Sequence, residues 1–247
     1  MSNSKKNPET ISFFVPCLNE EKNIENTINN IINSVQKTDL KFEIIIVDDN
    51  SFDNTRNIVT AFKEKNKNFN ISLIENKKTM GLGRNYVDIS FIAKGKYYML
   101  VNGDNAEPEE TILTILKEIG KADMIIPFFD DQDNRVFFRV FMSKTFTFLI
   151  NFISGYKIKY YNGPVVHLRF NVMRWSPDTY GFAYQAELIT RTLDEKATYK
   201  HVRIKNLNRT SGRSKAFTLQ NIMSVSHSII QIFLRRLRWI LFYRNHG

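Results

Sequence analysis

The chain has 247 residues, of which 43% are hydrophobic and 24% are charged. That length and balance are typical of a folded α/β protein with a sizeable core, and they exclude a mainly disordered chain. A single cysteine, Cys17, excludes an intramolecular disulfide and favours a reducing compartment. The 35 Lys and Arg residues against 25 Asp and Glu residues give a net charge of +10, which favours an anionic partner such as a nucleic acid, a phospholipid surface or a phosphorylated small molecule.

The N-terminal segment, MSNSKKNPET, has no apolar core and is not expected to act as a signal peptide. No window of the chain reaches the roughly 18 uninterrupted apolar residues that a transmembrane helix needs. We therefore expect a cytoplasmic protein that is not integral to a membrane.

Apolar runs bounded by turn residues alternate with helix-period segments through the first half of the chain. The predicted strands are 11–19, 42–49, 70–76, 96–102 and 123–129. The predicted helices between them are 20–35, 54–65, 83–94 and 108–120. Continuous apolar strands that alternate with helices predict a mainly parallel sheet covered on both faces, whose ligands bind at the carboxyl ends of the strands.

The second half of the chain differs in character. A very aromatic helix is predicted at 135–153, a β-like patch at 159–170, a helix at 182–195 and a long helix at the C-terminus. No internal repeat, low-complexity tract or Gly/Ser linker divides the sequence. We therefore expect a single α/β domain with a specialised C-terminal half.

The strand at 42–49 ends in the sequence VDDNS, which places Asp48, Asp49 and Ser51 at the carboxyl edge of the predicted sheet. A carboxylate there can accept hydrogen bonds from the N–H groups of uracil or guanine and thereby distinguish one base from another. The same residue types are also ordinary in turns and helix caps, and for this segment alone that alternative stays open.

The sequence GLGRN opens the helix that follows the third predicted strand. Gly81 and Gly83 allow the backbone to approach a ligand, and Arg84 adds a forked hydrogen-bond donor beside a helix N-terminus that favours anions. The segment therefore suits a diphosphate. The alternative is a loop with a solvated arginine.

Taken together, these segments resemble the family 2 glycosyltransferases, which use nucleotide sugars. VPCLNEEKNI is similar to the first-strand motif of that family, EIIIVDDNSFDNT is similar to the second, and VNGDNAEP stands where the family carries Asp-x-Asp. GFAYQAELITR followed by NRTSGRSKAF is similar to the branch that contains dolichyl-phosphate mannose synthases and bacterial polyprenyl-phosphate glycosyltransferases. The resemblance covers roughly residues 11 to 220.

The resemblance implies an α/β, glycosyltransferase A (Rossmann-like) fold with a mainly parallel central sheet and a helical, acceptor-binding C-terminal half. We expect a catalytic domain over residues 1–220 and an amphipathic C-terminal helix over residues 221–247.

By the same resemblance, Asp104 binds a divalent cation, Mg²⁺ or Mn²⁺, on the donor diphosphate, and Asn102 takes the first position of Asp-x-Asp. An amide oxygen can coordinate such a cation but brings no charge, so Asn102→Asp is expected to tighten metal binding. The alternative is that Asn102 and Gly103 form a plain turn. The residues that the resemblance assigns to the nucleotide sugar are Pro16, Leu18, Glu20, Val47, Asp48, Asp49, Ser51, Gly81, Gly83, Asn102 and Gly103.

Two basic clusters are predicted to bind the acceptor. On the helix at 135–153, Arg135, Arg139 and Ser143 recur at steps of four and share one face, which can bind a phosphate that carries a hydrocarbon tail. A basic loop further on contributes Arg209, Ser211, Arg213, Ser214 and Lys215. Each cluster alone is equally consistent with a solvated basic surface, and the match of both to the polyprenyl-phosphate branch favours an acceptor site.

The resemblance implies inverting transfer of a hexose from a nucleotide-diphosphate sugar to a dolichyl or undecaprenyl phosphate. A phosphate acceptor is already ionised, so the reaction needs no strong general base, while the cation and Arg84 neutralise the leaving nucleoside diphosphate. Gln185 and Glu187 match the Gln-x-Glu pattern of the mannose-synthase branch, and Glu187 is expected to orient the sugar or a basic residue. The alternative for Glu187 is a carboxylate on a helix surface.

The terminal segment from Ser228 to Gly247 mixes large apolar residues with Arg235, Arg236 and Arg238. It is too charged to cross a bilayer, but an Arg-rich helix with Trp and Phe can lie on an anionic membrane surface. That interpretation predicts a peripheral protein on the cytoplasmic face of a membrane, with a separate membrane subunit left open. The alternative is a helix packed on the body of the protein with a basic outer face.

Two other functions remain as alternatives. One is an inverting glycosyltransferase that uses a glycan or other hydroxyl acceptor in cell-surface polysaccharide synthesis, which Asn102 and the divergent sequence KYYNGPVVHLR allow. The other is a non-catalytic module that binds nucleotides or nucleic acid, which the net charge suggests. It ranks last because the aromatic residues gather on a core-like or lipid-facing helix and not on a basic surface where bases could stack.

Overall fold

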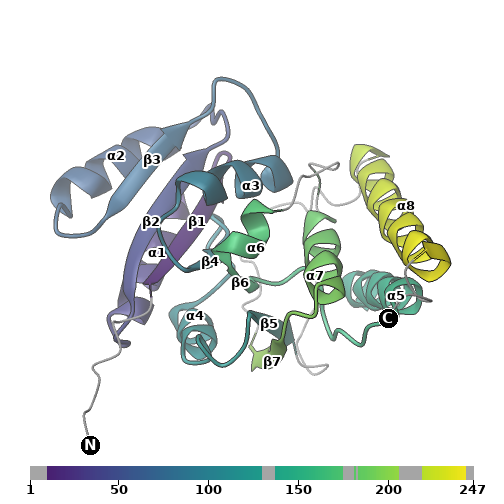
Figure 1. Cartoon of the computed structure of the whole chain (residues 1–247). Coiled ribbons are helices and arrows are strands. Elements are labelled where there is room, and N and C mark those ends of the chain that lie inside the picture. Colours follow the sequence, from purple (N-terminus) through teal and green to yellow (C-terminus); the bar gives the residue numbers. More distant parts are fainter. Residues whose placement is uncertain (1–9, 130–136, 175–180, 182, 206–218, 243–247) are drawn as a thin grey trace, which may run out of the picture.

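The computed structural model describes residues 10–129, 137–174, 181, 183–205 and 219–242. Within these ranges seven strands form one sheet, in the order β3-β2-β1-β4-β6-β5-β7 (Figure 1). The strands are β1 Thr10–Cys17, β2 Lys41–Asp48, β3 Ile71–Glu75, β4 Tyr97–Leu100, β5 Met124–Phe129, β6 Val166–Leu168 and β7 Tyr199–Ile204. The helices are α1 Ile24–Val35, α2 Thr55–Lys65, α3 Leu82–Ile92, α4 Glu109–Leu116, α5 Phe137–Ser154, α6 Arg169–Met173, α7 Tyr184–Asp194 and α8 Leu219–Phe242.

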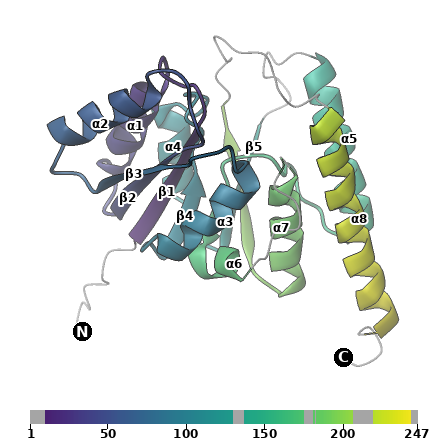
Figure 2. The same cartoon turned by 90° about the horizontal axis from the view of Figure 1, so that it is seen from above.

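The central strands are apolar at nearly every position because helices cover both faces of the sheet. Phe13 of β1 faces the core shared with α1 and α4, whereas its neighbour Phe14 faces the core shared with α3 and α7. Figure 2 shows the same layers, with α1, α2 and α4 on one side of the sheet and α3, α6 and α7 on the other. The predicted α/β fold with a mainly parallel sheet is therefore confirmed.

The β-like patch predicted at 159–170 becomes only a three-residue strand, β6, which runs antiparallel to both β4 and β5. Asn162, Gly163 and Pro164 precede it, and proline has no N–H to give to a strand ladder. The chain then turns at once into α6. The strand β7 was not predicted from the sequence, because its charged residues obscure the alternation of Val202 and Ile204 that faces the core.

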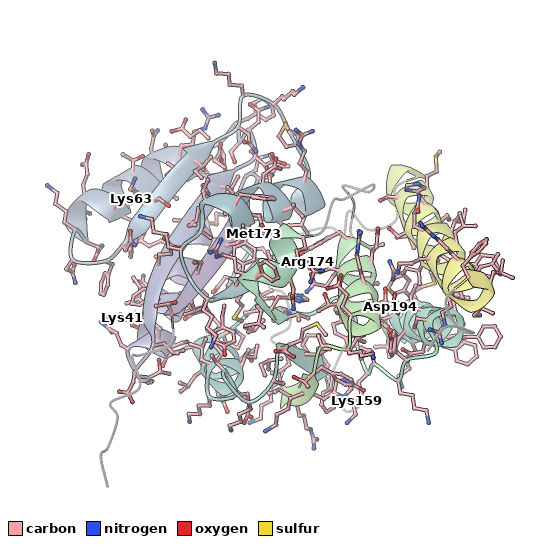
Figure 3. All side chains as sticks on the ribbon, viewed as in Figure 1. Lys41, Lys63, Lys159, Met173, Arg174 and Asp194 are labelled. Carbon is pink, nitrogen blue, oxygen red and sulfur yellow. The ribbon has the colours of Figure 1, made fainter. Side chains whose placement is uncertain are left out.

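The helices α5 and α8 lie side by side at the end of the molecule far from α2 and β3 (Figures 1 and 2). The inner face of α8 carries Ser228 and Ile232, both fully buried. Arg235 also points inward: its Nε donates to Asp194 Oδ2 at 2.8 Å, and one of its terminal nitrogens donates to Thr190 Oγ1 at 2.6 Å. Figure 3 shows Asp194 beside α7 at this end, away from Lys63 on α2.

In the described part of the chain, no helix combines the length and the apolar character required to cross a bilayer. The predicted boundary between a catalytic domain and a terminal helix at residue 220 stays a prediction, although α8 begins at Leu219 and packs on the body.

Candidate active site

The carboxyl ends of β1, β2 and β4 meet at one edge of the sheet, and the loops that follow them continue the strand pairing. The N–H of Asp49 donates to the carbonyl of Cys17 at 2.9 Å, and the N–H of Gly103 donates to the carbonyl of Pro16 at 3.1 Å. A side chain at Gly103 would place its Cβ 2.8 Å from that carbonyl oxygen. Glycine is therefore required where the loop after β4 approaches β1.

The loop from Asn102 to Glu107 is fixed by polar side chains of α1. The hydroxyl of Thr27 donates to the carbonyl of Gly103 at 3.1 Å and accepts from the N–H of Asn105 at 3.0 Å. Asn30 donates to the Asn105 side chain at 2.8 Å, which holds Asn105 in the left-handed region at φ 58°. The segment that the alternative describes as a plain turn is a loop anchored at several points, and Asp104 lies within it, half-buried.

Glu107 is the residue of this loop that sequence reasoning missed. Its buried carboxylate accepts from the Asn102 backbone N–H at Oε2 (3.1 Å) and from the Asn102 side-chain amide at Oε1 (3.0 Å). Burial raises the pKa of Glu107 to about 7, although the hydrogen bonds from Asn102 act in the opposite direction. The only signal in the sequence was an acidic residue directly before Pro108, which also fits an ordinary helix start.

The side chains after β4 fit a hard divalent cation. Asp104 supplies a carboxylate and Asn102 an amide oxygen, and Mg²⁺ or Mn²⁺ binds through one or two such ligands when phosphates and water complete the coordination. Among the described residues no group of three or more His, Cys, Asp or Glu side chains could hold a metal ion. The chain alone therefore offers a partial site, which suits a cation that arrives with a diphosphate.

The two carboxylates after β2 are engaged inside the protein. Asp48 is fully buried; its Oδ2 accepts from Arg56 Nε at 2.9 Å and from the N–H of Ser51 at 3.1 Å. Asp49 accepts from the N–H groups of Met80 and Gly81 at 2.8 and 3.0 Å. These contacts tie the loop after β2 to the loop before α3, and a role of either carboxylate in reading a base stays a prediction.

The charge of Asp49 is stabilised by these donors. Burial by itself would raise the pKa of its carboxyl group, but the hydrogen bonds from Met80, Asn76 and Gly81 outweigh burial and lower the pKa. The ionised form therefore holds the loop before α3 in place at neutral pH.

The start of α3 has the geometry expected of a backbone that approaches a ligand. Gly81 adopts φ 90° and ψ 154°, a conformation that residues with a Cβ rarely adopt, and Gly83 is buried in the first turn. Arg84 is half-exposed on this turn and contacts Asp88 at 3.3 Å. That exposed i,i+4 pair is weak.

Pro16 lies near the end of β1, and Leu18 and Glu20 lie in the loop that follows; all three are half-buried at the same edge. The left-handed residue Asn19 links this loop to the loop after β2: its N–H donates to Ser51 Oγ at 2.9 Å and its side chain accepts from the N–H of Phe52 at 2.8 Å. These hydrogen bonds join the loop after β1 to the loop after β2, and the assignment of both loops to the nucleotide sugar stays a prediction.

Glu187 and Gln185 lie in the first turns of α7 and are both buried, with 3% and 2% of their surfaces exposed. The alternative in which Glu187 is a carboxylate on a helix surface is therefore wrong. Gln185 donates to the carbonyl of Gly163 at 3.5 Å, which links α7 to the segment before β6. Their catalytic roles stay predictions.

Most of the predicted acceptor residues fall outside the described residues: Arg135, Arg209, Ser211, Arg213, Ser214 and Lys215. Arg139 lies in α5, and its side chain is also outside the description. Ser143 is half-buried and shares a face of α5 with Asn151, which bonds inward to the backbone of Ile158.

The strand order, in which β6 is the one antiparallel strand among the described residues, defines the class of the protein: an α/β protein with the glycosyltransferase A fold. The same fold occurs in glucosyl-3-phosphoglycerate synthase from Mycobacterium tuberculosis, solved in complex with Mn²⁺, uridine diphosphate and glucosyl-3-phosphoglycerate. The superposition has a TM-score of 0.66 at 18% identity and covers 92% of this chain and 80% of the synthase chain. At that identity the likeness establishes the fold alone.

The protein belongs to Glycosyl transferase family 2, whose family model matches residues 12–179. Among curated relatives, dolichyl-phosphate beta-glucosyltransferase of Dictyostelium discoideum is 37% identical over 122 residues, which cover 46% of this chain and 37% of the relative. Glycosyltransferase GlyG of Streptococcus pneumoniae serotype 4 is 31% identical over 137 residues, which cover 53% of this chain and 44% of the relative. The chain thus matches less than half the length of each relative, and the family resemblance seen in the motifs is confirmed.

Proposed function

We propose that the protein transfers a hexose, with inversion, from a nucleotide-diphosphate sugar to a polyprenyl phosphate at the cytoplasmic surface of an anionic membrane. The donor is supported by the family and by the edge that carries Asp104, Asn102 and the Gly81 turn. The polyprenyl-phosphate acceptor is supported by the match to a dolichyl-phosphate glucosyltransferase.

On the donor side, Asp104 and the amide oxygen of Asn102 would hold Mg²⁺ or Mn²⁺, which supplies positive charge at the diphosphate when bound. The N-terminal turn of α3 offers backbone N–H groups and Arg84 to the same anion. These groups stabilise the negative charge that develops as the nucleoside diphosphate leaves.

On the acceptor side, the attacking oxygen belongs to a phosphate that is already ionised, so no residue has to remove a proton from it. Buried Glu187 suits a role in orienting the sugar or a basic side chain better than one as an exchangeable base. Arg139 and Ser143, one turn apart on α5, would bind the acceptor phosphate.

The observation that carries the lipid acceptor is the apolar outer surface of α5 and α8. On α5, Phe148 and Phe152 are 71% and 78% exposed and stack on each other with their ring centroids 6.3 Å apart. On α8 the exposed large side chains recur at helical spacing along one stripe: Ile230, Phe233, Leu234, Leu237, Ile240 and Leu241. Two adjacent helices with exposed apolar faces are typical of a surface that enters a lipid interface.

Two arginines of α8 are engaged with neighbouring parts of the protein. Arg235 contacts Asp194 and Thr190 on α7, and a guanidinium nitrogen of Arg236 lies 3.2 Å from where a Cβ on Gly155 would be. The helix is therefore packed on the body, as the alternative expected, but both arginines are partly covered and the exposed face is mainly apolar. Arg238 remains exposed beside it and can contact anionic headgroups.

The test is an assay of purified protein with UDP- and GDP-linked hexoses, in which polyprenyl phosphate is compared with polyprenol and with phosphoglyceric acid. We expect a glycosyl phosphate lipid of inverted anomeric configuration from polyprenyl phosphate only, and no product from Asp104→Ala that is folded by circular dichroism. Arg139→Ala should raise the KM for polyprenyl phosphate about tenfold or more, since a charge-assisted contact is lost, while nucleotide-sugar binding stays unchanged.

The matched control on the same helix is Lys144→Ala, which removes an exposed cation. Equal effects of Arg139→Ala and Lys144→Ala would contradict the acceptor assignment. Transfer to polyprenol or phosphoglyceric acid at the rate of polyprenyl phosphate would replace the proposal with the hydroxyl-acceptor function.

A further inference from the structure

The pair formed by Asn102 and Glu107 determines which atom of the Asn102 amide is available to a ligand. In the ionised form of Glu107 the carboxylate only accepts hydrogen bonds, so the amide group that contacts its Oε1 at 3.0 Å is the NH2 of Asn102. In the second contact, the backbone N–H of Asn102 donates to Oε2 at 3.1 Å, so both carboxylate oxygens are held by the same residue. The amide oxygen of Asn102 is then directed away from Glu107.

This orientation matters for a cation. An amide oxygen is a ligand for Mg²⁺ or Mn²⁺, whereas an amide NH2 presents hydrogens and repels a cation. A half-turn of the amide about its terminal bond exchanges the two. The residue that hydrogen-bonds the Asn102 amide therefore decides whether position 102 presents an oxygen ligand or a repulsive NH2 group to a cation.

Glu107 is itself held in place. Its side chain is buried, and its backbone carbonyl accepts from Asn30 of α1, the residue that also holds Asn105 at 2.8 Å. The loop therefore positions the carboxylate before any ligand arrives.

From these contacts we infer that Glu107 is a positioning residue that turns the Asn102 amide oxygen towards the cation and donor diphosphate. The inference rests on the donor site of the proposed function. It also accounts for the single Asp in this loop, because a carboxylate at position 102 would face the carboxylate of Glu107, and like charges at that distance are unfavourable. The expectation that Asn102→Asp alone tightens metal binding is thereby replaced: the amide and the carboxylate are matched as a pair.

The experiment moves the charge within the pair. In Glu107→Gln, only one oxygen remains at position 107 to accept the backbone N–H of Asn102. The new NH2 group then faces the NH2 of Asn102, and a hydrogen bond between the two side chains can form again only if the Asn102 amide turns over. In the double variant Asn102→Asp/Glu107→Gln, the carboxylate at 102 accepts from the amide at 107 and keeps its second oxygen for the cation. Net charge is the same in the double variant and the wild type.

The measured quantity is the Kd for Mn²⁺, taken from the free-Mn²⁺ electron paramagnetic resonance signal in the presence of UDP or GDP, whichever binds more tightly. Melting temperatures without metal are recorded for each variant. We expect Glu107→Gln to weaken Mn²⁺ binding about tenfold or more, as is typical when the partner of a metal ligand is changed. The double variant should return the Kd to within about threefold of the wild type or below it.

Two results would overturn the inference: an unchanged Mn²⁺ Kd in Glu107→Gln, or a double variant that keeps its melting temperature but binds Mn²⁺ as weakly as Glu107→Gln. A wild type that binds the nucleotide but no Mn²⁺ overturns both the inference and the metal of the donor site. The expected Kd pattern without any lipid-linked product overturns the polyprenyl-phosphate function and leaves the inference standing.

Discussion

His167 lies in the middle of β6, and its imidazole is completely buried. Its ring meets the ring of Tyr86 edge to face at 6.5 Å, and neither ring nitrogen has a hydrogen-bond partner within the described part of the chain. Burial lowers the pKa of His167 to about 3. The native protein therefore holds this histidine neutral at every pH at which the enzyme is expected to work.

The prediction concerns acid stability. The pKa of His167 in the folded protein lies below its value near 6.5 in the unfolded chain. The full free energy of unfolding is therefore present above pH 6.5 and is lost progressively as the pH falls from 6.5 towards 3. Between pH 7.5 and pH 5.0 this single group should cost about 2 kcal/mol of unfolding free energy. His167→Phe keeps a ring beside Tyr86 and cannot titrate. Between pH 7.5 and pH 5.0 the free energy of unfolding of this variant in urea should therefore fall by about 2 kcal/mol less than that of the wild type. Parallel pH profiles for the two proteins would show that His167 is not held neutral.

Some site residues could be read from the sequence because their chemistry depends on local order along the chain. Asp104 and Gly103 follow a buried strand directly, and Gly81 precedes a helix, so their spacing alone located them at the carboxyl edge. Glu107 could not be located in this way, since its role depends on a hydrogen bond back to Asn102 that only the folded loop creates. The inward contacts of Asp48 and Asp49 were equally hidden, because a sequence does not tell which donors surround a carboxylate.

At the scale of elements, the attachment of α8 depends on a clamp formed by Tyr156, Thr190, Asp194 and Arg235. The carboxylate of Asp194 accepts from Tyr156 at 2.9 Å and from Arg235 at 2.8 Å, while Arg235 also reaches Thr190. Both charged side chains are about three-quarters covered, at 27% and 28% exposed. The clamp therefore joins the segment after α5, α7 and α8 at one point.

Arg235→Ala should lower the free energy of unfolding by about 1 to 3 kcal/mol, because Asp194 then loses its charged partner in a partly buried place. Amide hydrogen exchange along α8 should accelerate at the same time. Arg238→Ala removes an arginine from the exposed side of the same helix and serves as the control, with a change of about 0.5 kcal/mol or less. If the two variants unfold alike in urea, the clamp does not hold α8.

The periodicity of α8 predicted a helix but did not predict which of its faces would turn inward. Ile232 and Arg235 lie on the covered side, while Phe233 and Leu237 lie on the open side, so large apolar residues occur on both. A pattern of this kind specifies the helix and leaves its rotation to the partners on α7 and α5. The sheet was easier to predict, since a strand such as β2, which is apolar at four successive positions, is buried on both faces and therefore has no solvent-facing side to assign wrongly.

At the scale of the whole molecule, the donor edge and the apolar surface lie on different parts of the fold. The donor edge lies at the ends of β1, β2 and β4, and the apolar surface formed by α5 and α8 lies at the end of the molecule away from α2 (Figures 1 and 2). The net charge of +10 adds a general attraction to anionic surfaces. These properties together favour a protein that lies against a membrane through α5 and α8 while its donor edge stays in water.

The last prediction tests this arrangement with vesicles of mixed neutral and anionic lipid. Phe148→Ser/Phe152→Ser removes two large exposed rings of α5 without touching the core, so its melting temperature should stay unchanged. Each phenylalanine that enters lipid contributes roughly 1.5 to 3 kcal/mol, so the double variant should bind vesicles about tenfold more weakly or worse in sedimentation. High salt should weaken wild-type binding only in part, because screening acts on the charges and not on apolar contact.

Phe170→Ser is the matched control, since Phe170 is an exposed phenylalanine on α6, away from the α5–α8 surface. Its vesicle affinity should equal that of the wild type. Truncation of α8 would be a poorer test, because Ser228 and Ile232 belong to the core and their loss would disturb the fold itself. Equal losses for Phe170→Ser and the α5 variant would point to a non-specific effect, and full binding by the α5 variant would move the membrane contact elsewhere on the protein.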